Sequence, residues 1–371
     1  MKEIPFARSA PYSLGVELEF QILAADTLNL TSRAEKMRAM FPPLEQDHVA
    51  GEFLQSIFEV QTGICATVDE VEQDLRHMIK VADDIALQCG CVLFASGIHP
   101  FALPEEQKVS DNERYLRIMN ELQRVGRQFI AQGHHVHVGM SSRKTVVKVC
   151  DAIQAYLPLL LALSTSSPYF TGEDTGFHSY RTKLFEALPL AGIAEYLGDW
   201  ESYEQMVGML LTAGVIQDTC DLWWDVRPSP YLGTIEIRIC DMPSSFSDIM
   251  ALSALIQALV VYIAEEELPR QLINHQLLRH NKWQASRHGL KGGFSDPFFF
   301  FSATPQTLAD TVLLLLETLE PVMFRLGSAR WADRIRHIVV HGTSADRQRE
   351  LVRDRGSMKD MIAQLRSEFW S

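Results

Sequence analysis

The sequence predicts an α+β fold in which helices pack against one face of an antiparallel or mixed β-sheet and the other face stays polar. The predicted strands alternate apolar and polar residues, as strands with one buried face do. Predicted helices are interspersed between them, but the strands are not apolar throughout, which argues against a doubly wound parallel sheet. The chain has 371 residues, of which 47% are hydrophobic. Because no linker or internal repeat divides it, we expect a single domain over residues 1–371.

The composition argues against several classes of function. The formal net charge is −13 and no lysine- or arginine-rich tract occurs, so we expect no nucleic-acid partner. The six cysteines form no C-x-x-C pair, which indicates free thiols in a reducing compartment. The first residues lack an apolar signal core, and the longest weakly polar run, 249–264, is short for a bilayer. We expect a cytoplasmic protein without a membrane partner; the oligomeric state stays open, a homo-oligomer included.

The first predicted strand, residues 15–20, is the stretch around which the chain is organised. Its alternation places Glu17 and Glu19 on one face and Val16, Leu18 and Phe20 on the other. Two carboxylates on one face repel each other, so we expect a positive group between them: a divalent metal, an arginine or both. An edge strand with a solvated acidic face would explain this stretch alone equally well.

Three more predicted strands combine an apolar face with ionisable side chains. They cover residues 53–64, 134–139 and 234–240, and the ionisable side chains are Glu59, His135, His137, Glu236 and Arg238. A single carboxylate on a strand is more often a solvated surface group, and an isolated H-x-H is more often structural than metal-binding. Four such strands in one sheet, however, indicate a common functional site on its polar face.

Helix signals separate the strands. A capping box at Thr67 and apolar residues at three- and four-residue spacing predict a helix that stops at Gly90. A second capping box at Ser110 predicts a helix that ends near Gly133. The polar segment 164–183 is predicted to be a long ordered, functional loop. Further helices are predicted over about 144–163, near Trp200, from Ser247 to about Leu268, and from Thr304-Pro305.

The clustered carboxylates and histidines suit a particular class of metal. Mg²⁺ and Mn²⁺ prefer oxygen ligands and Mn²⁺ readily accepts an imidazole, whereas zinc sites usually have fewer carboxylates. The polar face therefore predicts a platform for a nucleotide with Mg²⁺, where arginines stabilise charge on a transferred phosphate. Arg181, Arg227 and Arg238 are the candidates for that role. Neither a Walker A motif nor G-x-G-x-x-G occurs, so a P-loop or Rossmann site is not expected.

Several motifs occur together in the order that they have in a known family. They are Gly15-Val16-Glu17-Leu18-Glu19, Gly133-His134-His135-Val136-His137-Val138-Gly139, Asp225-Val226-Arg227-Pro228-Ser229-Pro230, Gly233-Thr234-Ile235-Glu236-Ile237-Arg238 and Asn281-Lys282-Trp283-Gln284-Ala285-Ser286-Arg287-His288-Gly289-Leu290. Asp111-Asn112-Glu113-Arg114-Tyr115 and Ser166-Ser167-Pro168-Tyr169 fit too. From about residue 12 to 365, the chain resembles the bacterial carboxylate–amine ligases of the glutamate–cysteine ligase type 2 family.

The resemblance implies a glutamine-synthetase-like sheet, curved and antiparallel, with a polar catalytic face and helices outside. It implies a ligase that uses ATP to phosphorylate an amino-acid carboxylate, glutamate first, and joins it to an amine such as cysteine. ADP and phosphate leave. Mg²⁺, or Mn²⁺ in its place, would serve as cofactor with ATP. The implied metal ligands are Glu17, Glu19, Glu59, His135, His137 and Glu236. Arg181, Arg227 and Arg238 would be catalytic, and Asp225, Asn281 and Arg287 would bind the nucleotide.

Two rival hypotheses come from other classes of protein. The H-x-H and the nearby carboxylates would also suit a metal-dependent hydrolase, which needs no ATP. A metal- or nucleotide-binding protein without enzymatic activity is the third reading. Release of ADP with Mg²⁺ and a panel of amino acids separates the ligase from both.

Overall fold

The computed structural model describes residues 4–266, 273–298 and 304–371, and a seven-stranded antiparallel sheet lies at its centre. The strand order is β10-β11-β5-β1-β3-β2, and β4 pairs with the far end of β1. This arrangement confirms the predicted α+β class with an antiparallel sheet. The strands are β1 (Leu14–Ala24), β2 (Val49–Gly51), β3 (Ile57–Gln61), β4 (Cys91–Phe94), β5 (His134–Gly139), β10 (Val226–Ser229) and β11 (Thr234–Ile237).

The register of β1 brings the ionisable residues of its neighbours together. Glu17 lies opposite His135 of β5, and Glu19 lies opposite Glu59 of β3. Farther along, His137 of β5 lies opposite Glu236 of β11. Residues that face each other across antiparallel strands point to the same side of the sheet. The pairing therefore gathers the polar residues on one face and leaves the apolar residues on the other.

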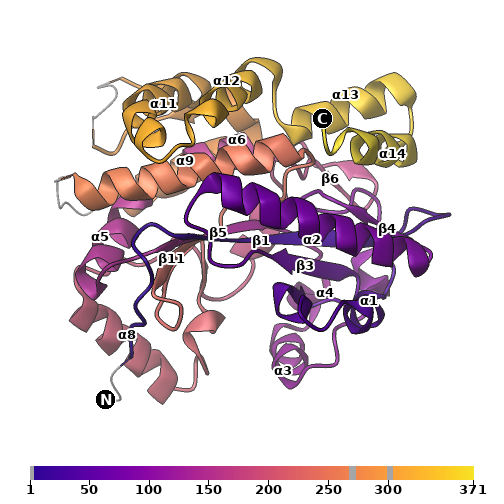
Figure 1. Ribbon diagram of the computed structural model, residues 1–371, viewed down its shortest axis with the longest axis horizontal. Coiled ribbons are helices and arrows are strands. Elements are labelled where there is room, and N and C mark those ends of the chain that lie inside the picture. Colours follow the sequence, from indigo (N-terminus) through magenta and orange to yellow (C-terminus); the bar gives the residue numbers. More distant parts are fainter. Residues whose placement is uncertain (1–3, 267–272, 299–303) are drawn as a thin grey trace.

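Three helices cover the apolar face of the sheet: α2 (Val68–Gln88), α5 (Arg143–Ile153) and α9 (Phe246–Glu265). In Figure 1, α2 and α9 lie above the strands, and α11 and α12 lie above α9. By length and composition α9 could span a membrane, as could α5 and α6 if that bent pair is one span. However, 89% of the most apolar stretch of α9 is buried, because this helix forms the centre of the core.

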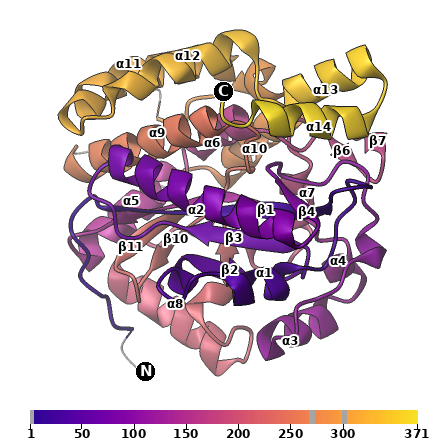
Figure 2. The same cartoon turned by 45° about the vertical axis from the view of Figure 1, so that its right-hand side comes forward.

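Other elements surround this centre. Figure 2 shows α3 on the side of the sheet opposite α2, whereas α1 packs against β2 and α2, and α8 packs against α5. In the described part of the chain, the remaining α-helices are α1 (Ala34–Met40), α3 (Glu113–Leu122), α4 (Arg124–Arg127), α6 (Leu157–Ser164), α7 (Arg181–Glu186), α8 (Trp200–Thr212), α10 (His275–His288), α11 (Leu308–Arg325), α12 (Ala332–His341), α13 (Ser344–Arg355) and α14 (Met358–Glu368). The short strand pairs are β6 (Tyr169–Phe170) with β7 (Glu173–Asp174), β8 (Ala191–Gly192) with β9 (Trp223–Trp224), and β12 (Gly293–Phe294) with β13 (Gln306–Thr307).

Several predicted helices have different bounds. The helix predicted from Ser110 to Gly133 begins after Asn112, which caps it, and breaks at Gln123, whose φ is 48°. The helix predicted over 144–163 is two helices bent by 66°. Pro158 lies in the first turn of the second one, where its missing N–H costs no hydrogen bond.

Two predicted helix starts are also wrong. Thr307, and not Thr304, caps α11: its side chain accepts from the backbone N–H of Asp310, while Pro305 precedes β13. The long apolar helix begins after Ser245 instead of Ser247. It ends at Glu265, and its predicted end at Leu268 lies outside the described residues.

Candidate active site

A cavity of about 430 Å³ lies against the polar face of the sheet. Helix α3 contributes Tyr115, Ile118 and Leu122 to its lining, and α7 and the segment after it contribute Phe185 and Leu188. The strands contribute the predicted ionisable residues Glu17, Glu19, Glu59, His135, His137, Arg227 and Glu236, joined by Arg238 just after β11. The structure therefore brings eight of the twelve predicted site residues to one cavity.

Glu17 lies between the two histidines of β5. One of its carboxylate oxygens is 3.4 Å from Nδ1 of His135, and the other is 3.2 Å from Nε2 of His137. The same Nε2 lies 3.9 Å from Oε1 of Glu236. The hydroxyl of Thr234 lies 2.9 Å from the other ring nitrogen of His137 and fixes the orientation of the ring. Alternation along β1, β5 and β11 thus produces a continuous row of ionisable groups.

A second carboxylate group lies on the β3 side of the cavity. Oxygen atoms of Glu19, Glu52 and Glu59 lie within 4.8 Å of one another. Glu19 accepts a hydrogen bond of 2.5 Å from the backbone N–H of Gly133, and Glu59 accepts one from the side chain of Gln61. At an effective dielectric constant of about 20, two full charges 4.8 Å apart would repel by about 3.5 kcal/mol. This group is therefore under electrostatic strain unless a cation or protons neutralise it.

The pKa values of the buried carboxylates are shifted in opposite directions on the β3 side and the β11 side of the cavity. Burial, with the nearby Glu52 carboxylate, raises the pKa of Glu19 to about 8, and burial with neighbouring carboxylates also holds the pKa of Glu59 well above its ordinary value. Burial alone would raise the pKa of Glu236, but Arg227 and Arg238 hold it well below the ordinary value. On the β3 side, burial and neighbouring carboxylates therefore outweigh the nearby positive charge, whereas on the β11 side two arginines balance Glu236.

The donor atoms fit divalent cations of the Mg²⁺ or Mn²⁺ class. Among the described residues there are three sets of possible ligands, and within each set the donor atoms lie within 4.8 Å of one another. The sets are Glu17, Glu59 and His135; Glu17, His137 and Glu236; and Glu19, Glu52 and Glu59. Nε2 of His135 is buried and has no hydrogen-bond partner among the described residues, as a nitrogen kept for a ligand would be. Ligands of Mg²⁺ lie about 2.1 Å from the ion, so donors on opposite sides of it are roughly 4.2 Å apart.

Two arginines share the Glu236 carboxylate. Nε of Arg227 donates to it at 2.7 Å and Nη2 at 3.2 Å, and Arg238 donates through Nη1. Two guanidinium groups against one carboxylate leave a surplus positive charge at the edge of the cavity. That surplus suits a phosphate or a substrate carboxylate, because guanidinium groups bind both in a bidentate manner.

Four predicted site residues do not line the cavity and have partners inside the protein. Arg181 is buried and donates to the carbonyls of Arg238 and Ile239. Asp225 forms a 2.6 Å ion pair with Lys282 of α10. Asn281 and Arg287 bind the backbone: Asn281 exchanges hydrogen bonds with Ser295, and Arg287 donates to the carbonyl of Gly176. Their predicted roles in catalysis and nucleotide binding stay predictions.

Sequence reasoning missed other residues that the structure places in the cavity. Glu52 lies in the connection between β2 and β3, outside any strand, so strand alternation could not identify it. Arg114 and Tyr115 of α3 also line the cavity, and Arg114 pairs with Asp221 at 3.0 Å. Both belong to the Asp111–Tyr115 motif, which was the available signal.

Comparison with known proteins agrees with this geometry. The family model for glutamate–cysteine ligase family 2 (GCS2) matches residues 13–366. A relative from Gloeobacter violaceus, named provisionally as a glutamate–cysteine ligase 2, is 35% identical over 98% of both chains.

Solved structures share the fold at low sequence identity. A glutamate–cysteine ligase from Francisella tularensis, in complex with AMP, is similar with a TM-score of 0.74 at 12% identity, over 99% of this chain and 90% of that one. A bifunctional glutathione synthetase from Pasteurella multocida gives 0.72 at 16% identity, over 96% of this chain and 52% of that one. The chain belongs to glutamate–cysteine ligase family 2, whose members are ATP-dependent carboxylate–amine ligases.

Proposed function

We propose that this enzyme uses ATP to phosphorylate the side-chain carboxylate of an amino acid and then joins the acyl group to an amine. Glutamate is the first candidate for the acid, and cysteine or another amino compound for the amine. The carboxylate attacks the γ-phosphorus of ATP and ADP leaves. The amine nitrogen then attacks the acyl carbon, and phosphate leaves with the two electrons of the broken C–O bond. The amine loses a proton, which gives an amide.

The observation that carries this proposal is the Arg227–Glu236–Arg238 cluster next to the three carboxylate-containing donor sets. Phosphoryl transfer requires stabilisation of charge on the transferred group and of the substrate carboxylate. Arg227 and Arg238 supply a surplus positive charge at one edge, while the glutamates provide oxygen ligands for divalent cations. A hydrolase of simple esters would not need both an arginine cluster and several metal-binding glutamates on one sheet face.

The metal ligands of this proposal are Glu17, Glu19, Glu52, Glu59, His135, His137 and Glu236. Bound Mg²⁺ or Mn²⁺ would neutralise phosphate charge and orient the phosphates of ATP. The protein residues have their own tasks: Arg238 and Arg227 orient the acceptor carboxylate and the phosphoryl group, and the apolar wall formed by Ile118 and Leu122 excludes water.

We also propose that Asp225, Asn281 and Arg287 help to place the nucleotide from outside the cavity. Support comes from Asp225, whose backbone carbonyl accepts from the N–H of Arg238 at 2.9 Å while its side chain holds Lys282. This connects α10 directly to the cluster at Glu236.

The whole chain, in this proposal, forms one catalytic domain in the cytoplasm and acts on small molecules, with no nucleic-acid or membrane partner. One hydrophobic cluster that includes residues from Ile4 to Phe369 supports the single domain. A homo-oligomer is compatible with the proposal but not required by it.

The test is an ADP-release assay with ATP, Mg²⁺ and pairwise combinations of acids and amines, followed by mass spectrometry of the amide. We expect ADP release that depends on both substrates and stops in excess EDTA. Hydrolysis of test esters without ATP, together with no ADP release from any combination, would favour the metal-dependent hydrolase instead.

A further inference from the structure

Arg238 lies one residue beyond the end of β11, so the regular sheet ladder does not hold its carbonyl. Its backbone N–H donates to the carbonyl of Asp225 at 2.9 Å, and its own carbonyl accepts from Nη2 of Arg181 at 3.2 Å. The other terminal nitrogen of Arg181 donates to the carbonyl of Ile239, also at 3.2 Å. One buried guanidinium group thus replaces two ladder hydrogen bonds where the catalytic candidate Arg238 leaves the sheet.

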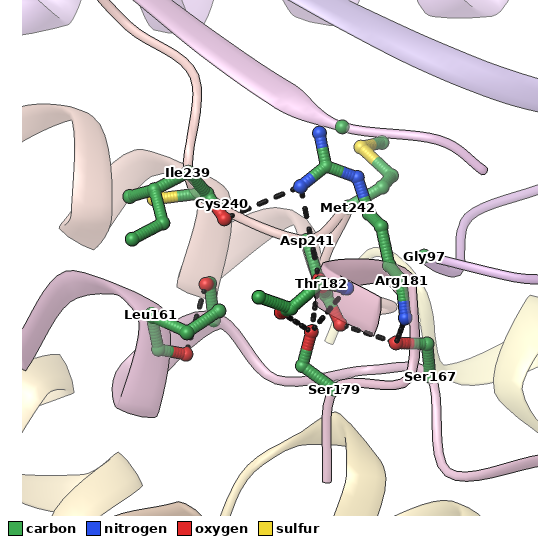
Figure 3. A network of polar contacts seen from close by, with 12 residues as sticks. Gly97, Leu161, Ser167, Ser179, Arg181, Thr182, Ile239, Cys240, Asp241 and Met242 are labelled. Atoms are coloured by element: carbon green, nitrogen blue, oxygen red, sulfur yellow. Dashed lines mark hydrogen bonds and ion pairs between the residues drawn. The ribbon is translucent and has the colours of Figure 1, made fainter. Parts of the chain in front are cut away.

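Asp241 holds Arg181 in this place, as Figure 3 shows. Oδ1 of Asp241 lies 3.9 Å from Nη1 of Arg181 and accepts from the hydroxyl of Ser179 at 2.8 Å. Oδ2 accepts from the hydroxyl of Ser167 at 2.7 Å and from the backbone N–H of Ser166 at 3.0 Å. The hydroxyl of Ser167 also accepts from the backbone N–H of Arg181 at 3.1 Å. The segment 166–182 and the segment after β11 therefore meet at this carboxylate.

The surrounding backbone leaves Asp241 and Arg181 little room to move. Asp241 is fully buried. A Cβ atom added at Gly97 would lie 2.9 Å from Cγ of Asp241, and one added at Gly133 would lie 2.6 Å from Nη2 of Arg181. Both distances are shorter than normal carbon contacts, so these two glycines allow the close approach.

The same network reaches the floor of the cavity. Gly133 forms an antiparallel bridge with Asp241, and its N–H donates to Glu19. Because removing an ion pair from water costs free energy, apolar residues of similar volume in this space would give the folded protein a similar stability. A charged pair at this position is better explained by what it holds in place than by its contribution to folding.

We propose that Asp241 is a positioning residue, which fixes Arg181 and through it the backbone of Arg238, so that the Arg238 guanidinium faces the transferred phosphoryl group. This inference rests on the proposed function. Arg181 acts in it through the Arg238 carbonyl and not by contact with substrate.

The experiment is a double-mutant cycle of Asp241→Asn and Arg238→Lys, with kcat and the KM for ATP measured by ADP release. Asparagine keeps the size of the side chain but removes the charge and turns one acceptor oxygen into a donor. If Asp241 acts through Arg238, Asp241→Asn lowers kcat at least tenfold and changes the KM for ATP less than threefold. In the Arg238→Lys background it then lowers kcat less than threefold, because the two losses share one cause.

Asp248→Asn is the matched control. Asp248, a residue of α9, is also a buried carboxylate, and it forms a 2.6 Å ion pair with Arg334 of α12. This control variant should change kcat less than twofold at a temperature where both variants are folded. If Asp241→Asn does not fold, Ser179→Ala, which removes one donor to Asp241, takes its place in the cycle. If the losses of kcat in Asp241→Asn and Arg238→Lys are additive, or if Asp241→Asn leaves kcat unchanged while the wild type turns over normally, the positioning role is overturned. The proposed function would not be affected by either result. No ADP release by the wild type would overturn the proposed function and this inference with it.

Discussion

Individual residues of the cavity differ in how their charge is balanced, although they lie on one sheet face. Glu236 is matched by two arginines, whereas Glu19, Glu52 and Glu59 have mainly each other as charged neighbours. A group of three carboxylates, of which those of Glu19 and Glu59 are buried and that of Glu52 is half-buried, is costly in a folded protein unless it binds protons or cations. The β3 side of the cavity is therefore where metal binding and protonation compete.

The competition predicts a pH dependence of stability in metal-free protein. Because burial raises the pKa of Glu19 to about 8, above its ordinary value, the folded protein holds this proton more tightly than the unfolded chain. The resulting stability is present below about pH 4 and is lost as the pH rises through about 8. We expect the free energy of unfolding in EDTA to fall between pH 5.5 and 8.5 in wild type, and to fall less in Glu19→Gln, which has no proton to lose.

Urea unfolding at the two pH values checks this prediction. At pH 8.5 the glutamine variant should exceed the wild type by on the order of 2 kcal/mol, because it removes repulsion within the carboxylate group. It should also gain less stability from Mg²⁺ and lose turnover. Glu121→Gln, an exposed glutamate of α3, is the control. Equal pH profiles for all three proteins would show that Glu19 is an ordinary solvated carboxylate.

Arg238→Lys is expected to lower kcat at least tenfold while ATP still binds. The planar guanidinium can hold Glu236 and a phosphoryl oxygen at once, whereas a lysine ammonium has neither the reach nor the fork geometry. Steady-state kinetics and ATP titration measure the two quantities separately. Arg330→Lys, an exposed arginine paired with Asp69, is the control. Wild-type kcat in Arg238→Lys would exclude Arg238 from the chemical step.

At the scale of elements, the segment between α6 and α7 is held from outside by α13. Arg349 of α13 donates to both carboxylate oxygens of Asp174, at 2.9 and 2.7 Å, and to the carbonyl of Phe177 at 2.8 Å. His178 lies 3.3 Å from Asp346 of the same helix. A C-terminal helix thus orders the segment that carries Ser179 and leads into Arg181.

Arg349→Ala should therefore loosen this segment without unfolding the protein. We expect hydrogen exchange of the amides of 173–178 to become at least tenfold faster. The global free energy of unfolding should change by only about 0–1 kcal/mol, as is usual for partly exposed ion pairs. Arg353→Ala is the control, because Arg353 lies on the same helix but pairs with its neighbour Asp354. Unchanged exchange in Arg349→Ala would mean that other contacts order the segment.

At the scale of the whole molecule, the net charge of −13 and the carboxylate-rich cavity both favour cation binding. Removal of divalent metal should abolish turnover, and Mg²⁺ or Mn²⁺ in excess of the chelator should restore it. Thermal unfolding should shift upward with Mg²⁺ and ATP together, since ligands that bind only the folded state stabilise it. Full turnover in excess EDTA would refute the metal platform.

The sequence predicted well those features that depend on local periodicity. Alternation in 15–20 and 134–139 identified Glu17, Glu19, His135 and His137 as neighbours on one face, and the register of β1 with β5 confirmed this arrangement. The capping residue Thr67 was correct as well, since its side chain accepts from Glu70. These signals need only the geometry of a strand or of one helical turn.

Helix continuity was predicted less well, because tertiary contacts decide where a helix bends. The first half of the predicted helix over 144–163 is amphipathic and the residues after Gln154 are apolar, so the spacing of polar residues cannot show how the second half is oriented. The structure bends it by 66° at the turn before Pro158. The same limit applies to the helix that breaks at Gln123.

By itself, then, the sequence determined the fold class, the polar sheet face and most of the ionisable residues on it. Only the tertiary structure decided that Glu52 joins Glu19 and Glu59, and that Arg181 and Asp241 stand behind Arg238 instead of facing the cavity. The physical reason is that strand alternation fixes the face on which a side chain lies. The position of a residue in a loop or at the end of a strand depends on contacts with segments that are distant in the sequence.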